Sequence, residues 1–227
     1  MKIWGCFAAL ICWGQAAMAE PILLPGIGAG VRHNVDVSKN PWRILGRVQT
    51  ELGTRCTGFL VAPSVIETAA HCLWLPQTEH YVQPSSVHFL LGYDAGDFRA
   101  TARGVRIIIP PGYDPHYEIR TGQADHATII LDHPVASNRE ILPSIAPSVG
   151  QQAMLAGYEQ DRGEIAFGDV HCQITAIRGR LLDHDCAATH GASGAPLLLL
   201  GPQGWGIGGI DIWAQAEKGG TAIRVSD

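Results

Sequence analysis

Residues 65–72 read VIETAAHC, and this stretch sets the expected fold of the surrounding chain. Val65–Ala69 is rich in β-branched residues, which favour a short strand, and His71 and Cys72 follow that strand directly. A lone histidine among ten is more often structural or exposed, so here its position matters more than its type. A general base needs a fixed imidazole, and a disulfide at the next residue would restrain its loop.

Short strand-like segments of the same kind continue on both sides, each bounded by Gly, Pro, Asn or Asp. The first set is Arg43–Gln49, Cys56–Val61, Val65–Ala69, Ser86–Leu91, Gly104–Ile109 and Ala127–Leu131. The second set is Gln152–Ala156, Val170–Ile177, Leu181–Leu182, Ala195–Leu200, Gly206–Ile212 and Thr221–Val225. Pro134–Pro147 lies between them, is poorer in strand pattern and is interpreted as a linker. The pattern predicts an all-β protein of two small barrels in tandem, residues 41–135 and 136–227.

The first nineteen residues are interpreted as a signal peptide. Lys2 is followed by the apolar run Ile3–Trp13 and by the small-x-small pattern at 17–19. The run is too short to span a bilayer of about 30 Å as a helix, and a buried N-terminal helix is the alternative. Residues 20–40 are rich in Gly and Pro and are expected to form an N-terminal arm or a short propeptide. We therefore expect a secreted or periplasmic protein without a stable membrane anchor.

Cysteine usage fits an oxidising compartment. After removal of the signal, Cys56, Cys72, Cys172 and Cys186 remain, and four cysteines allow three pairings. Pairing of sequence neighbours, Cys56 with Cys72 and Cys172 with Cys186, is expected, and each loop would contribute about 3 kcal/mol in the loop-entropy model. A zinc site is the competing interpretation, but C-x-x-C and H-E-x-x-H spacings are absent. No metal and no cofactor are expected.

The charge distribution excludes one class of partner. The formal net charge is −5, and the chain has no run of like charges and no basic cluster. Phosphate binding needs concentrated Lys and Arg, so nucleic acid is not an expected partner.

Residues 191–196 read GASGAP and precede the apolar run Leu197–Leu200. A glycine two residues before Ser193 lets the backbone turn so that the amides of Gly191 and Ser193 point the same way. Two such amides can form an oxyanion hole, where each donor contributes roughly 2.7–4 kcal/mol to transition-state stabilisation. The alternative interpretation is an ordinary Gly/Ser turn before a strand.

Asp125 opens the segment DHATIIL (125–131), at the start of a buried strand. An acid there can simply cap a turn, but a shielded carboxylate at a strand edge can also accept an imidazole N–H and hold its tautomer. Asp94 and Asp97 are rival acids, although residues 92–97 are expected to form an exposed turn.

Taken together, TAAHC (68–72), DHATIIL and GASGAP resemble the chymotrypsin/trypsin-like serine peptidase family, in the family order His, Asp, Ser. CTG (56–58), GY (157–158) and GIDIW (209–213) add to the match, which covers about Pro41 to the C-terminus. An α/β-hydrolase is excluded, because it needs G-x-S-x-G, where this chain has Ala195, and a histidine after the serine, which this chain lacks.

The resemblance implies two six-stranded antiparallel barrels with the active site in the cleft between them. His71 would act as general base and Asp125 would orient it. Ser193 would form an acyl-enzyme, and the Gly191 and Ser193 amides would bind the oxyanion. The implied activity is that of a serine endopeptidase acting as a monomer on proteins or peptides, without a cofactor.

The sequence departs from the family pattern at two places, which bear on how the enzyme is activated and on which branch of the family it resembles. Ala192 stands where the digestive enzymes carry the Asp that pairs with a newly cut N-terminus, and only 14 residues follow Trp213. The chain is therefore similar to the bacterial secreted branch, which includes relatives of the glutamyl endopeptidases.

Residues expected at the substrate pocket are Ala187, Thr189, His190, Asp211 and Trp213. Ala187 occupies the position of the pocket-floor Asp of trypsin, so trypsin's own means of recognition is absent. A carboxylate at Asp211 would favour Arg or Lys before the scissile bond and repel Glu; the alternative is an Asp that is solvated or paired elsewhere. Residue preference stays open at this point.

Two other functions are alternatives to an active endopeptidase. One is a catalytically silent binding protein on the same scaffold, a class that usually lacks one of the three reactive residues. The other is a processing protease that stays latent until its lead segment is cut, with Arg32 or Lys39 as the cleavage site.

Overall fold

The computed structural model describes Met1, residues 31–215 and residues 219–225. The expected signal peptide after Met1, and the arm up to residue 30, lie outside the described residues.

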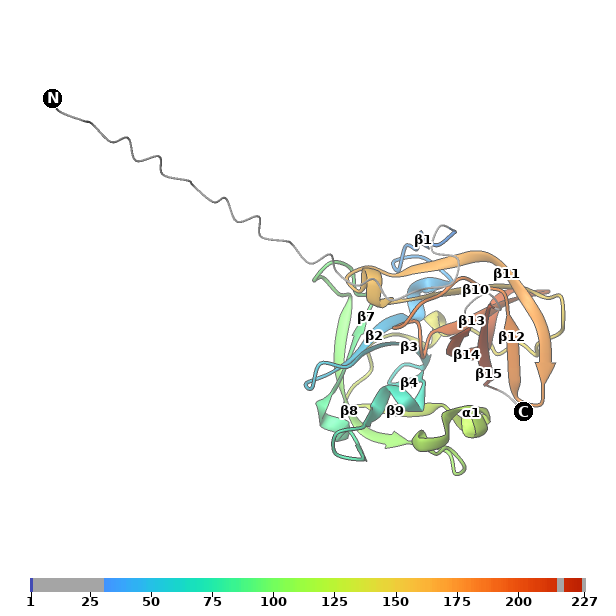
Figure 1. The fold of residues 1–227 in the computed structure, drawn as a ribbon. Coiled ribbons are helices and arrows are strands. Elements are labelled where there is room, and N and C mark those ends of the chain that lie inside the picture. Colours follow the sequence, from blue (N-terminus) through green and yellow to red (C-terminus); the bar gives the residue numbers. More distant parts are fainter. Residues whose placement is uncertain (2–30, 216–218, 226–227) are drawn as a thin grey trace.

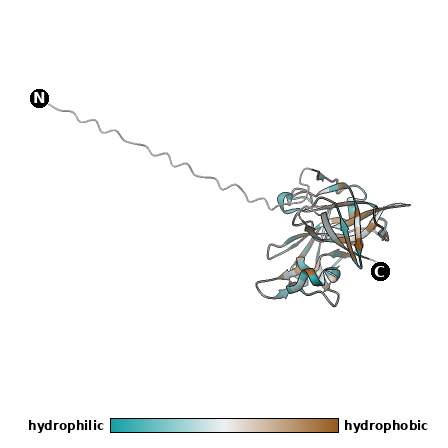
Figure 2. Ribbon diagram, turned by 45° about the vertical axis from the view of Figure 1, so that its right-hand side comes forward, coloured by the Kyte–Doolittle hydropathy of each residue, from teal (hydrophilic) through white to brown (hydrophobic). Residues whose placement is uncertain are grey.

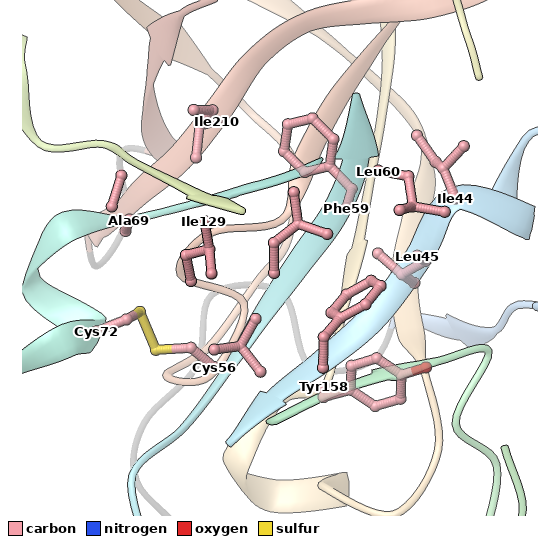
Figure 3. Close-up of a cluster of buried hydrophobic side chains, with 14 of the residues drawn as sticks. Ile44, Leu45, Cys56, Phe59, Leu60, Ala69, Cys72, Ile129, Tyr158 and Ile210 are labelled. Atoms are coloured by element: carbon pink, nitrogen blue, oxygen red, sulfur yellow. A yellow bond between two sulfur atoms is a disulfide. The ribbon is translucent and has the colours of Figure 1, made fainter. Parts of the chain in front are cut away.

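The N-terminal half forms a closed antiparallel barrel in the strand order β2-β3-β4-β9-β8-β7 (Figure 1). Its strands are β2 (Leu45–Thr50), β3 (Arg55–Ala62), β4 (Val65–Thr68), β7 (Val87–Leu91), β8 (Ala100–Ile108) and β9 (Ala127–Leu131). The barrel is filled by fully buried side chains that include Phe59, Leu60, Phe89 and Ile129, several of which are drawn in Figure 3.

The C-terminal half forms a second antiparallel barrel in the order β11-β10-β13-β14-β15-β12, which closes because β12 also pairs with β11. Its strands are β10 (Gln152–Gly157), β11 (Phe167–Arg178), β12 (Leu181–His184), β13 (Pro196–Gly201), β14 (Gly204–Gln215) and β15 (Gly219–Arg224). A short strand from the arm, β1 (His33–Asn34), adds to the edge of β11. Leu155, Ile174, Leu197 and Leu199 are buried inside.

The connections carry short elements. These are β5 (Trp74–Leu75), β6 (His80–Tyr81), the helix α1 (Glu118–Thr121) and the 3-10 helices η1 (Trp42–Ile44), η2 (Ala70–Leu73), η3 (Pro84–Ser86), η4 (Pro115–Tyr117), η5 (Gly122–Ala124), η6 (Asn138–Glu140) and η7 (Gln160–Arg162). In Figure 2 the hydrophobic colouring follows mainly the strands and the hydrophilic colouring the loops. None of the helices in the described chain is long and apolar enough to cross a membrane.

The prediction of two six-stranded antiparallel barrels is confirmed. The sequence pattern missed β1, the β5–β6 pair and α1. It also predicted β11 and β14 to be shorter than they are. β11 begins at Phe167 and runs through Gly168 and Asp169, residue types that are rare in strands. Pairing with β10 on one side and β1 on the other holds these residues extended, so tertiary context overrides local preference there.

Candidate active site

His71 and Asp125 meet because β4 and β9 are paired neighbours in the first barrel. Thr68 pairs with Ala127, so η2 at the end of β4 and the residues just before β9 leave the barrel side by side. Asp125 is completely buried. Its Oδ2 lies 2.8 Å from His71 Nδ1, and its Oδ1 accepts the backbone N–H of His71 at 3.0 Å. One carboxylate therefore fixes both the ring and the backbone of His71.

The electrostatics of this pair raise the pKa of His71 above its ordinary value. Burial alone lowers the pKa of the imidazole, but the hydrogen bond and the charge of Asp125 outweigh it, with smaller contributions from Glu118 and Asp211. With Nδ1 donating to Asp125, the neutral ring has its other nitrogen, Nε2, available to accept a proton.

Ser193 lies in the turn before β13 and is tied to the first barrel. Its carbonyl oxygen accepts the N–H of Thr57 in β3 at 3.0 Å. Gly194, with φ of +83°, packs so closely that a Cβ there would overlap the Thr57 carbonyl and the Thr68 hydroxyl. Only glycine combines this backbone conformation with that approach. The serine turn therefore lies directly against the strands that lead to His71.

The amides of Gly191 and Ser193 are available as donors. Within the described chain neither N–H donates a hydrogen bond, whereas their neighbours Ala192 and Gly194 donate to Thr189 and Asp211 at 3.1 and 2.7 Å. Gly191 has φ of +94°, which L-residues rarely adopt. An oxyanion hole requires amide donors that are left unbonded in this way.

Two disulfides restrain this region. Cys56 in β3 is bonded to Cys72 beside His71, at the edge of the first barrel core in Figure 3. Cys172 in β11 is bonded to Cys186, which precedes the serine turn. Each bridge thus anchors a loop that carries one of the reactive residues to a strand of its own barrel.

Two cavities meet at His71 and Ser193, which line both. The first, of about 530 Å³, is lined by Gly53, Thr54, Arg55, Cys56, His71, Tyr158, Gln160, Gly163, His190, Gly191 and Ser193. The second, of about 590 Å³, is lined by His71, Glu118, Ile119, Thr189, His190, Ser193, Asp211, Ile212, Trp213 and Ala214. An extended chain could therefore occupy both sides of a bond held at Ser193. No hydrogen bond joins His71 to Ser193 in the described chain, and such contacts are often long before substrate binds.

Asp211 forms a buried pair with His184, a histidine that belongs to none of the sequence motifs. Its Oδ1 lies 3.1 Å from Nε2 of His184, and both residues are almost completely buried. Burial raises the pKa of Asp211, although the hydrogen bond and charge of His184 oppose this. Asp211 is therefore paired, as one interpretation of the sequence had it, and also lines the second cavity.

The other expected pocket residues divide into two groups. Thr189, His190 and Trp213 line the second cavity. Ala187 does not; it is buried and donates its N–H to Asp169 at 3.0 Å. The rival acids Asp94 and Asp97 are exposed and bonded to each other's backbone in a turn.

One grouping in the described chain has the spacing of metal ligands, formed by Cys56, His71 and Cys72. Both cysteines are joined in a disulfide, so neither can supply a thiolate. The donor set therefore does not fit a zinc ion.

Among the residues of the site that sequence reasoning missed are His184, Glu118, Ile119 and Gln160. Each reaches the site through a loop or strand distant in sequence, and none carries a local motif. Asp211 was singled out, but nothing in the sequence indicated its partner.

Known proteins resemble this chain in sequence and in fold. The Trypsin family model matches residues 31–227. A trypsin from Phaedon cochleariae is 28% identical over 120 residues, which are 53% of this chain and 43% of that protein. Serine protease filzig from Drosophila melanogaster is 29% identical over 138 residues, 56% of this chain and 8% of that protein. The chain thus spans less than half the length of either curated relative.

A solved structure of a Glu endopeptidase in complex with MPD superimposes with a TM-score of 0.70 at 20% identity, covering 88% of this chain and 93% of that one. That likeness concerns the fold. Because the family model covers nearly all of the described residues, this chain belongs to the trypsin family.

Proposed function

We propose that this protein is a serine endopeptidase with His71, Asp125 and Ser193 as its catalytic residues. The observation that carries the proposal is the buried Asp125 carboxylate, 2.8 Å from His71 Nδ1, beside two cavities that His71 and Ser193 both line. Membership of the trypsin family supports the same activity.

In the proposed mechanism, the Ser193 hydroxyl attacks the carbonyl carbon of the scissile bond while its proton passes to His71 Nε2. The electron pair of the carbonyl moves onto its oxygen, which the Gly191 and Ser193 amides stabilise. The tetrahedral intermediate collapses, His71 gives the proton to the leaving amine, and an acyl-enzyme remains on Ser193. Water, activated by His71, then releases the acid. Asp125 holds the His71 tautomer and stabilises the imidazolium.

The proposal includes export from the cytoplasm to a secreted or periplasmic location. Two disulfides in a chain of this size are typical of oxidising compartments. The signal peptide expected over residues 1–19 would provide the route.

Labelling with a fluorophosphonate tests the proposal directly. We expect one covalent adduct on the oxidised wild-type protein by intact-mass spectrometry and none on Ser193→Ala or His71→Ala. The reagent reports an assembled nucleophile and does not depend on knowing the natural substrate. A folded, oxidised wild type that takes up no label would contradict the proposal and favour the silent or latent alternatives.

We further propose that the second cavity receives the side chain before the scissile bond, and that its chemistry favours Lys or Arg. Asp211 contributes a carboxylate to the wall of the cavity, and in the described chain His184 occupies only its Oδ1. A carboxylate there attracts a cationic side chain and repels a glutamate. Thr189, His190 and Trp213 would form the rest of that pocket.

Replacing Asp211 with Asn should lower kcat/KM for substrates with Lys or Arg at this position by roughly 10- to 100-fold, because a charge-assisted hydrogen bond is lost. Substrates with a neutral side chain should change much less, so the ratio of the two rates is the measurement. Asp132→Asn, which alters an exposed acid of the first barrel, is the matched control. Equal losses for cationic and neutral substrates would refute this assignment.

A further inference from the structure

The segment that supports the Ser193 turn is itself held by an arginine from the N-terminal arm. We define the oxyanion loop as residues 189–193 and the support segment as residues 157–162. The support segment leaves the end of β10 and continues into η7, and it lies directly beneath the oxyanion loop.

Contact between the two is close and made mainly by backbone. The N–H of Gln160 donates to the carbonyl of His190 at 2.6 Å. A Cβ on Gly191 would overlap the Tyr158 carbonyl and would crowd Gln160 N and Glu159 Cα at 3.0 and 3.2 Å. A shift of the support segment would therefore move the amide of Gly191, one of the two proposed oxyanion donors.

Thr57 links the same two pieces to the first barrel. Its hydroxyl donates to the Gly191 carbonyl at 2.8 Å and accepts the N–H of Tyr158 at 2.8 Å. This fixes one end of the support segment. Just beyond the other end, the Gly163 carbonyl accepts from Arg47 at 3.1 Å and the Glu164 carbonyl accepts the N–H of Ala95 at 2.6 Å, so the first barrel also holds the chain there. Residues 159–162, between these ties, have no hydrogen bond to the first barrel in the described chain.

Arg32 ties residues 159–162 to the N-terminal arm. Its guanidinium is almost fully buried, forms an ion pair with the equally buried Glu159, and donates two hydrogen bonds to the Asp161 carboxylate at 3.2 and 2.7 Å. The hydrogen bond from Arg32 is the main reason that the pKa of Asp161 is lowered. One side chain thus bridges two acids on either side of Gln160.

The arm brings Arg32 to this place through the second barrel. β1 pairs with β11, His33 opposite Gly168 and Asn34 opposite Phe167, and the N–H of Val35 donates to the carbonyl of Ala166 at 3.1 Å. Arg32 immediately precedes this pairing and is therefore held rigidly.

A buried ion pair contributes little net stability compared with apolar residues of the same shape, because both charges must leave water. Such pairs are better explained where one arrangement has to be fixed. We infer that Arg32 is a positioning residue: through Glu159 and Asp161 it fixes the support segment, and through that segment it holds the Gly191 amide in the oxyanion hole. This inference rests on the proposed function.

The test compares the full-length oxidised wild type with Arg32→Gln and with Arg43→Gln. Arg43 is a matched control, since its guanidinium also donates two hydrogen bonds to an acid, at 3.2 and 2.9 Å to one carboxylate oxygen of Glu140, but it lines neither cavity. The measurements are kcat and KM on a peptide amide, normalised to titrated active sites, and inhibition by a peptidyl trifluoromethyl ketone. That ketone adds the Ser193 hydroxyl, and its oxygen then occupies the oxyanion hole.

We expect Arg32→Gln to lower kcat by about 10- to 100-fold with KM changed by less than about threefold, because misplacing an oxyanion donor acts on the transition state. Affinity for the trifluoromethyl ketone should fall in parallel, and Arg32→Lys should recover part of both. Arg43→Gln should match the wild type. A purely structural role would lower the number of titrated sites and leave kcat per site unchanged, and that result would overturn the inference.

If Arg32→Gln does not accumulate as folded protein, the same measurements are made on Asp161→Asn, which leaves the ion pair between Arg32 and Glu159 in place. A fall in kcat of about 3- to 10-fold, with a matching loss of ketone affinity, would support the inference; unchanged values would overturn it. A wild type without Ser193-dependent hydrolysis would instead contradict the proposed function. An active wild type with an equally active Arg32→Gln contradicts only the role of Arg32.

The inference also predicts the opposite of the latent alternative, in which cutting the arm activates the enzyme. The Lys39 side chain is exposed, whereas the Arg32 side chain is buried. Cleavage after Lys39 would separate Arg32 from the covalent chain, so we expect it to weaken the enzyme and not to activate it.

Discussion

Replacing Ser193 with Ala should lower kcat for peptide hydrolysis by about 10⁶-fold, which is the typical cost of removing the nucleophile of such a triad. Residual hydrolysis about 10³- to 10⁴-fold above the uncatalysed rate should persist, since the oxyanion amides and the binding cavities remain. The Ser193 side chain makes no hydrogen bond in the described chain, so the melting temperature should change little. Single-turnover assays with purified protein measure the loss.

Ser148→Ala is the control for this substitution, because Ser148 is exposed and in the described chain is hydrogen-bonded only to the nearby Gln151. It should hydrolyse peptides at the wild-type rate. Substantial hydrolysis by Ser193→Ala, beyond what active-site titration assigns to contaminating enzyme, would contradict the role of Ser193.

Replacing Asp125 with Asn should lower kcat by about 10⁴-fold at neutral pH, since the amide would favour the wrong His71 tautomer. The pH profile should change as well. In the wild type we expect activity to rise as His71 loses its proton, at a pH above the ordinary pKa of 6.5 because Asp125 raises the pKa of His71. Without the carboxylate, burial still lowers that pKa, so the acidic limb of the profile should move to lower pH.

The rate and the pH profile are measured on the same variants. Asp97→Asn, which alters one of the rival acids in the exposed turn, should leave both at wild-type values. An Asp125→Asn enzyme with an unshifted acidic limb would show that another group sets the His71 pKa.

Much of the architecture followed from local signals. The core strand β9 was predicted at its observed bounds, Ala127–Leu131, because an apolar β-branched run there ends abruptly at Asp and Pro. Short exposed elements such as β5, β6 and α1 were not predicted. Each contains only a few residues, so its pattern is too brief to separate from a turn.

The substrate side of the site was the least predictable part. Ala187 was expected at the pocket and does not line the cavity, whereas Glu118 and Ile119 line it without having been expected. The cavity walls come from loops of both barrels and from β14, and their side-chain directions depend on packing that no local pattern encodes.

The sequence by itself determined the fold class and singled out the candidate reactive groups, because strand periodicity and the His, Asp and Ser motifs are local in the chain. Only the tertiary structure decided which distant groups meet. Pairing of β4 with β9 brought Asp125 to His71, β14 and β12 brought Asp211 to His184, and β1 brought Arg32 to Glu159. Such contacts depend on how the strands pair within each barrel. A buried charge needs a partner, and local sequence does not indicate which residue that partner is.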